Sequence, residues 1–174
     1  WVLNGVECLL QKASGFNIEQ IMLVIGNDML HTDNGKATTG GTLQDSDGMW
    51  YEAFLAAIET IIDMIELLLP VADIHCHYDP SNHDYISGFM LADSIKSYFR
   101  NNKNMTFDFS IRHRKYYKWN QSLIGTTHGD GAKWKDLPNL MAMEAKEQWS
   151  TTNHKYFYTH HIHHKQAQDF IGVT

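Results

Sequence analysis

The stretch IMLVIGND, residues 21–28, decides the fold and the place of the candidate site. Residues 21–25 form a continuous apolar run of strand length, which predicts a strand buried on both faces. Asp28 follows directly after Gly26 and Asn27, so its carboxylate is expected to project from the end of that strand. Ligands of open α/β sheets bind just beyond the carboxyl ends of the strands. The stretch therefore predicts a ligand site at the end of a buried strand.

Outward from this strand, helical and extended patterns alternate along the chain. The predicted helices are residues 1–13, 49–69, 87–100 and 137–149. The predicted strands are residues 71–74, 106–111, 115–119, 122–125 and 155–158, the middle three of them in a meander. Asp47 is expected to cap the second helix, and Pro70 to end it. This order predicts a layered α/β or α+β fold, with residues 1–174 forming a single domain.

Composition narrows the class of protein. With a formal net charge of −6, the protein does not bind nucleic acid over its whole surface. A contact with nucleic acid would need a local basic patch or a metal ion. Two cysteines, Cys8 and Cys76, are too few for a disulfide scaffold, and a reduced cytoplasmic protein is the default. The longest apolar stretch contains Glu59, Asp63 and Glu66, which argues against a membrane span.

Four separated clusters of metal-binding side chains each follow a predicted strand. They are Asp28–His31–Asp33, Asn82–His83–Asp84, His128–Asp130 and His161–His163. If residues 161–163 are extended, the two imidazoles share one face and reach a common site. Imidazole and carboxylate together favour Mn, Fe or Zn over Ca or Mg. The clusters therefore predict one metal centre that is assembled from distant parts of the chain.

Three of the clusters also have a structural interpretation, and the alternative for His161–His163 is a fortuitous affinity for metal ions. Asp28 suits a turn, and Asn82 and Asp84 are good helix caps. His128 lies in a glycine-flanked turn, where a solvated side chain is common. Cys76, between His75 and His77, is either a metal ligand or a buried thiol.

The ordered set of motifs resembles the calcineurin-like metallophosphoesterases, particularly the phage-type members of that superfamily. The matching segments are 27–31 (NDMLH), 81–84 (SNHD), 127–130 (THGD) and 160–163 (HHIH). The resemblance implies a four-layer α/β/β/α sandwich with two divalent metal ions, Mn first, and Fe or Zn as alternatives. It also implies hydrolysis of a phosphate ester by a metal-bridging water.

The resemblance assigns roles to individual residues. Asp28 matches the carboxylate that bridges both metals. The other implied metal ligands are Asn82, His128 and His161 for the second metal, and His163 for the first. His83 matches the residue that contacts the phosphate and assists the leaving group, and Asp84 matches its orienting partner.

The chain departs from the family pattern in two ways. The glycines expected before Asp28, Asn82 and His161 are replaced by Asn27, Ser81 and His160, which predicts relaxed loops. The opening D-x-H motif is absent, which identifies an N-terminally shortened member that lacks two ligands of the first metal. His31, Asp33, His75 or His77 could partly substitute for them. A missing strand also leaves a sheet edge unpaired, so we expect self-association as a homo-oligomer.

A basic and aromatic stretch bears on the substrate. Arg112, Arg114, Lys115 and Lys118 alternate with aromatic residues, which suits either nucleic-acid binding or an ordinary solvated strand. The predicted activity is metal-dependent phosphodiester hydrolysis, with DNA as the favoured substrate and the host cytoplasm as the compartment of a phage protein. The alternative is a non-catalytic metal-binding or nucleic-acid-binding module on the same fold.

Overall fold

The computed structural model describes residues 1–163, 166–170 and 172–174 and has a mixed α/β fold with two small sheets. The first sheet has the order β1-β2-β3, all parallel, with β1 at Gln20–Gly26, β2 at Asp73–Asp79 and β3 at Met105–Asp108. The second sheet has the order β4-β5-β6. Its β4, Lys115–Trp119, is antiparallel to β5, Ser122–Thr127, which is parallel to β6, His154–Thr159.

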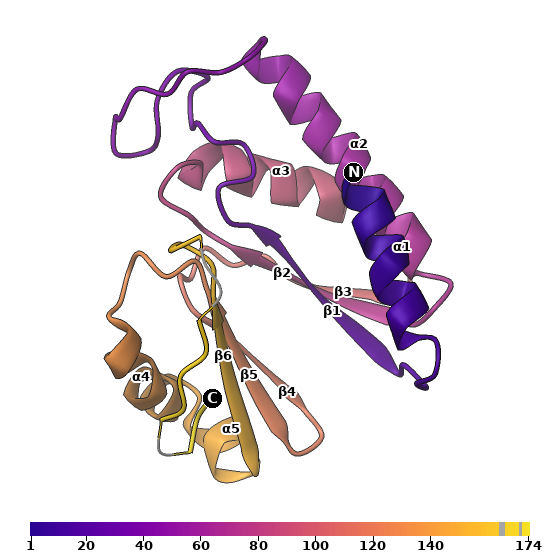
Figure 1. Ribbon diagram of the computed structural model, residues 1–174, viewed down its shortest axis with the longest axis vertical. Coiled ribbons are helices and arrows are strands. Elements are labelled where there is room, and N and C mark those ends of the chain that lie inside the picture. The colour runs from indigo at the N-terminus through magenta and orange to yellow at the C-terminus, as the bar shows by residue number, and fades with distance from the viewer. Residues whose placement is uncertain (164–165, 171) are drawn as a thin grey trace.

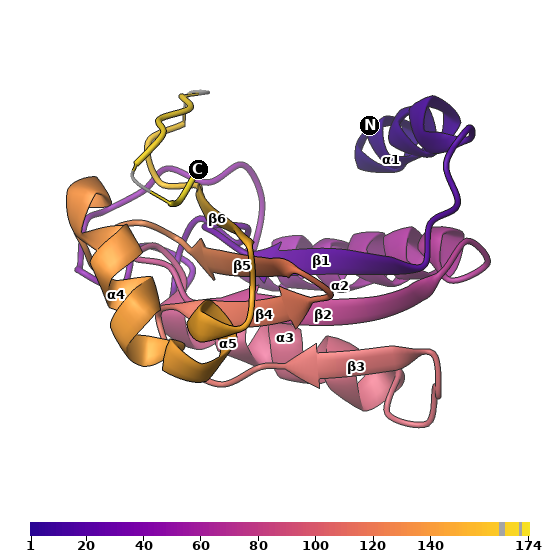
Figure 2. The same ribbon diagram turned by 90° about the horizontal axis from the view of Figure 1, so that it is seen from below.

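Helices cover the outer face of each sheet. In Figure 1, α2 (Trp50–Leu68) and α3 (Tyr85–Tyr98) lie on the face of the first sheet that is turned away from the second sheet. Helices α4 (Leu137–Glu144) and α5 (Lys146–Ser150), after a short 3-10 turn at Trp134–Asp136, lie beside the second sheet. Helix α1 (Val2–Ala13) contacts α2 and lies at one side of the molecule in Figure 2.

Two separate apolar clusters form the core. The larger one lies between α2, α3 and the first sheet, where Ile61, Ile65 and Ile95 are fully buried. The smaller one joins Leu123 of β5 to Met141 and Ala145 of the α4 segment. Each fully buried aliphatic side chain contributes roughly 1.5–3 kcal/mol relative to an exposed one. The helices are therefore held on the outer faces of the two sheets.

The space between the two sheets is polar. His77 and Asp79 of β2, together with Lys115 and Thr126 of the second sheet, are each no more than 1% exposed. Thr126 Oγ1 donates a hydrogen bond to Asp79 Oδ1 across this space at 3.1 Å. The two sheets thus meet through hydrogen bonds and charges.

Several sequence predictions need correction. Strand β1 is not buried on both faces, and Ile25 is its one buried residue. The reason is that β1 lies at the edge of its sheet. Strand β2 runs on beyond Ile74, since its polar residues face the space between the sheets. Strand β3 does not join a meander, because α3 returns the chain so that β3 pairs parallel with β2.

The helix ends also differ from expectation. Glu52, not Asp47, caps α2, where its carboxylate accepts the Met49 N–H at 3.0 Å. The helix predicted over residues 137–149 breaks at Ala145, whose ψ of 41° separates α4 from α5. In the described part of the chain, no helix has the length and apolar character needed to cross a membrane.

Candidate metal centre

The turn after β1 holds Asp28 in an unusual backbone conformation. Gly26, Asn27 and Asp28 all have positive φ, at 103°, 63° and 65°. A Cβ on Gly26 would lie 2.4 Å from the carbonyl oxygen of Asp79, so only glycine fits there. Asparagine and aspartate are among the residues that best tolerate the left-handed region. This turn is fixed further by the Asp28 N–H, which donates to Ser81 Oγ at 2.9 Å.

Four donor atoms from four segments converge at this turn. His128 Nε2 lies 3.3 Å from Asp28 Oδ2, 2.9 Å from Asn82 Oδ1 and 3.0 Å from His161 Nδ1. The ligand atoms of Asp28, His128 and His161 all lie within 4.8 Å of one another. The backbone N–H groups of His160 and His161 both donate to the His128 carbonyl at 2.9 Å, which fixes the two His segments side by side.

The chemistry of the donor set fits a cation. His128 Nδ1 lies 3.3 Å from Asn27 Oδ1, and a proton on Nδ1 would be donated to that oxygen. Nε2 then presents a lone pair to the oxygens of Asp28 and Asn82. Burial lowers the pKa of His128 despite the nearby Asp28 carboxylate, which favours the neutral imidazole. Electron pairs that face one another in this way are stabilised by a shared metal ion.

Asp84 and Ser81 fix the loops that carry the site through hydrogen bonds. Asp84 is fully buried and accepts hydrogen bonds from Leu30 N, at 2.8 Å, and from Ser81 Oγ. Burial raises the pKa of Asp84 while these bonds oppose the rise. The expected pairing of Asp84 with His83 is not made, because the carboxylate is turned toward the loop after β1. His83 instead places Nδ1 3.1 Å from the carbonyl of His31, and its backbone N–H donates to Asp28 Oδ1.

The other expected ligands are not gathered around His128. Asp33 caps α3, because its Oδ1 accepts the N–H groups of Ile86 and Ser87 at 2.7 and 2.8 Å. His31 is exposed and lies against His83, with ring centroids 5.3 Å apart. His163 is exposed, in a turn with φ of 51°, so residues 161–163 are not extended and the two imidazoles do not share a face. Of the described residues, the clustered set contains neither His31, Asp33 nor His163.

His75 and His77 do not extend this centre either. Both lie within β2 and face Tyr117 of the second sheet. Cys76, between them, points into the apolar core, is 0% exposed and has a pKa raised by burial. The thiol is therefore a core residue.

The basic residues of the segment 112–118 are mostly engaged within the protein. Lys115 is buried and donates to the carbonyl of Arg112 at 3.0 Å. Arg114 forms a two-pronged ion pair with Glu144, and Lys118 donates to Thr151 Oγ1. The Arg112 side chain is largely exposed, with a 3.7 Å contact to Asp108. These contacts favour the interpretation of an ordinary packed strand.

Asn27 and Ser81 contribute to the site, although the sequence pattern shows them only as replacements for glycine. Asn27 adopts the left-handed conformation itself and contacts His128, and Ser81 bonds both Asp28 and Asp84. The loops are therefore held by side-chain hydrogen bonds instead of being relaxed. The signal for Asn27 was available, because asparagine is a common substitute for glycine at positive φ.

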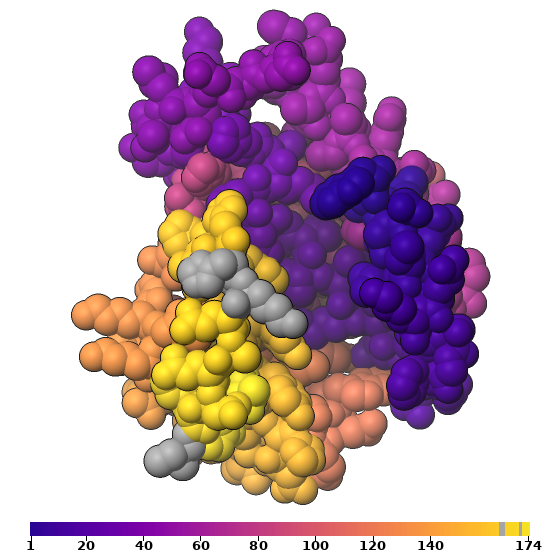
Figure 3. Space-filling model, viewed as in Figure 1, coloured from indigo at the N-terminus to yellow at the C-terminus, as the bar shows by residue number. Residues whose placement is uncertain are grey.

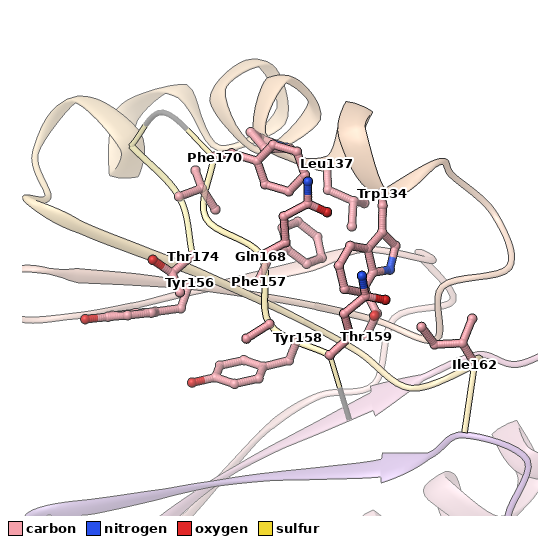
Figure 4. Close-up of a pocket in the computed structure, with 14 residues that line it drawn as sticks. Trp134, Leu137, Tyr156, Phe157, Tyr158, Thr159, Ile162, Gln168, Phe170 and Thr174 are labelled. Carbon is pink, nitrogen blue, oxygen red and sulfur yellow. The ribbon is translucent and has the colours of Figure 1, made fainter. Parts of the chain in front are cut away.

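Three hollows lie outside the donor cluster, and the most open one, beside Arg114 and Glu144, is lined by the ion pair already described. A second, of about 360 Å³, is lined by Leu30, Asp33 and Trp50 among others, and opens between the loop after β1 and the start of α2 (Figure 3). The third, of about 190 Å³, lies between β6, the start of α4 and the C-terminal segment (Figure 4). Its described lining is mainly aromatic and apolar and has no carboxylate, imidazole or cation. Among the described residues, none of these hollows holds a group of three or more metal donors like the cluster around His128.

Comparison of the chain with models of protein families, with curated proteins and with solved structures found no match.

Proposed function

We propose that this protein is a metal-dependent phosphoesterase of the calcineurin-like type, which hydrolyses phosphodiester bonds. The observation that carries the proposal is the convergence of Asp28, Asn82 and His161 on His128 Nε2 within 3.3 Å. Helices outside two facing sheets are consistent with the α/β/β/α sandwich of that superfamily, and the proposal includes this assignment.

The residues divide the work by position. Asp28, Asn82, His128 and His161 would hold a divalent transition metal, with Mn first and Fe or Zn as alternatives. When bound, such ions supply Lewis-acid stabilisation of the phosphate and a water nucleophile. The His83 backbone fixes the Asp28 carboxylate. The His83 ring is half-buried and places Nδ1 at the His31 carbonyl, and it is the group that would donate a proton to the leaving oxygen.

The test is hydrolysis of bis(p-nitrophenyl) phosphate with added Mn²⁺. We expect Asp28→Asn to lower the rate at least about 100-fold, because it removes a charged ligand from the centre. His154→Gln is the matched control, since His154 is exposed on β6, outside the donor cluster. Equal rates for the wild type and Asp28→Asn would remove Asp28 from the reaction and overturn the proposal.

A second candidate function is a metal-binding module without hydrolytic activity. It is favoured by one observation: the described residues gather only one set of three or more donors, and the Asp33 carboxylate already caps α3. In this case Asp28→Asn would bind one metal ion fewer than the wild type, while neither protein hydrolysed the phosphodiester. Metal binding measured beside the rates therefore separates the two functions.

A further inference from the structure

A second pair of histidines lies between the two sheets, in the middle of β2. His75 and His77 are two positions apart on a strand, so their side chains share one face. That face is turned toward the second sheet, where Tyr117 stacks on His75 with ring centroids 4.0 Å apart. The two rings approach each other so closely that His75 Nε2 and His77 Nε2 are 2.7 Å apart.

Threonine hydroxyls orient both rings from behind. Thr126 donates its hydroxyl proton to Asp79 Oδ1, so its oxygen is left to accept from His77 Nδ1 at 3.5 Å. His75 Nδ1 lies 2.6 Å from Thr106 Oγ1 on the neighbouring strand. When both Nδ1 atoms carry their protons, neither Nε2 atom has a proton to share across the 2.7 Å contact, and the two lone pairs repel each other unless a cation attracts both. Partners behind a ring nitrogen fix the tautomer of metal-binding histidines in the same way.

The electrostatic surroundings keep the lone pairs available. Burial lowers the pKa of His75 and lowers that of His77 to about 4, so neither ring holds an extra proton at neutral pH. The Lys115 cation acts in the same direction on His77. Asp108, the register partner of His77 on β3, supplies negative charge near both rings. Asp79 Oδ2 is buried without a hydrogen-bond partner among the described residues.

We propose that His75 and His77 form a metal site, separate from the centre at Asp28, that takes one divalent transition-metal ion such as Zn²⁺ through their two Nε2 atoms. Imidazole nitrogens suit Zn, Cu, Fe and Ni. His75 is only half-buried, so an ion and its remaining water ligands can enter beside it. A site with two protein ligands binds an exchangeable ion, in contrast to the closed four-ligand sites of structural zinc.

The test uses the full chain, stripped with a chelator and then titrated with Zn²⁺ in equilibrium dialysis. We expect His75→Gln to bind one ion fewer than the wild type, or to bind that ion at least about tenfold more weakly. His154→Gln is the matched control and should bind as the wild type does. His75 is the residue to change first because it is half-buried, whereas His77 is fully enclosed.

A second variant separates this site from the proposed catalytic centre. Asp28→Asn/His161→Ala removes the charge of one ligand and the imidazole of another from the Asp28 cluster, and it leaves the pair on β2 intact. We expect this variant to retain the ion that His75→Gln loses, and we expect that ion to raise its melting temperature. If His75→Gln bound as many ions as the wild type, with the same affinity, the proposal would be overturned. The contact between the two rings in the wild type would then be a hydrogen bond through a shared proton. Loss of hydrolysis alone would bear only on the proposed function.

Discussion

At the scale of single residues, buried carboxylates organise this molecule. Asp84 is 0% exposed and accepts the Leu30 N–H and the Ser81 hydroxyl, so it ties the loop after β1 to the loop after β2. Those two loops carry Asp28 and Asn82 of the candidate metal centre. Changes at Asp84 should therefore affect stability as well as the geometry of the site.

We expect Asp84→Ala to lower the free energy of unfolding by about 1–3 kcal/mol, because the buried Ser81 hydroxyl and the half-buried Leu30 N–H lose their acceptor. Urea unfolding measures the change. Asp93→Ala is the control, since Asp93 is exposed on the same helix α3. A loss no larger than that of the control would show that water replaces the carboxylate without cost.

Asp79 gives the protein a pH dependence of a specific sign. Burial raises its pKa to about 6, although Lys115 and Thr126 oppose the rise. The folded protein therefore keeps this proton up to about pH 6, while the unfolded chain releases it near pH 4. Stability from this group is present below pH 4 and declines as the pH rises to 6.

Asp79→Asn remains neutral at every pH and should escape that decline. We expect the variant to gain stability relative to the wild type as the pH rises from 4 to 6, by up to about 3 kcal/mol. The measurement is urea unfolding with a chelator at several pH values. The low pKa of His77, about 4, acts in both proteins and largely cancels in the difference. A difference that does not vary with pH would contradict the raised pKa.

At the scale of elements, the close approach of β1 to β2 depends on Gly26. Its φ is 103°, and a Cβ added there would lie 2.4 Å from Asp79 O, which leaves no room for a side chain. Gly41 has a similar φ of 87° with no atom within 4 Å, so it isolates the cost of the backbone conformation. We expect Gly41→Ala to cost about 1–2 kcal/mol. Gly26→Ala should cost clearly more in the same denaturation experiment, and equal costs would count against the close approach.

Much of the element pattern could be predicted from the sequence, because apolar periodicity reports which faces are buried. The helix at Trp50–Leu68 follows from that signal. The strand predicted from the sequence ends at Ile74, whereas β2 continues to Asp79. The sequence does not indicate this because His75, His77 and Asp79, which form the inner face of β2, are polar and do not look buried. The partner of β3 was missed for a related reason: pairing depends on where α3 returns the chain, and a local pattern does not contain this information.

The candidate site was predicted in part for a physical reason. Asp28, Asn82, His128 and His161 each follow the end of a strand by no more than three residues, so the sheets largely fix their positions. His31, Asp33 and His163 belong to loops, whose course depends on hydrogen bonds that the sequence does not display. Asp33 shows this well, since the N–H groups at the start of α3 take its carboxylate.

At the scale of the whole molecule, the free edge of β1 remains the reason to expect self-association. Among the described strands β1 pairs only with β2, so its other edge presents unpaired N–H and C=O groups. We expect a concentration-dependent dimer in light scattering, and a shift toward monomer in Met22→Lys, because lysine on an edge strand opposes pairing. Leu43→Lys, in an exposed loop, is the control. A wild type that stays monomeric at high concentration would contradict the expectation.

The polar space between the two sheets has a consequence for unfolding. Each sheet has its own apolar cluster, and little apolar surface is buried between the two sheets. As the denaturant concentration rises, the two sheets should separate before either sheet unfolds with its helices. Unfolding should therefore show two transitions in place of the single one typical of a small domain. Trp50 on one side and Trp149 on the other would report different midpoints, and an ion shared by Asp28 and His128 would draw those midpoints together.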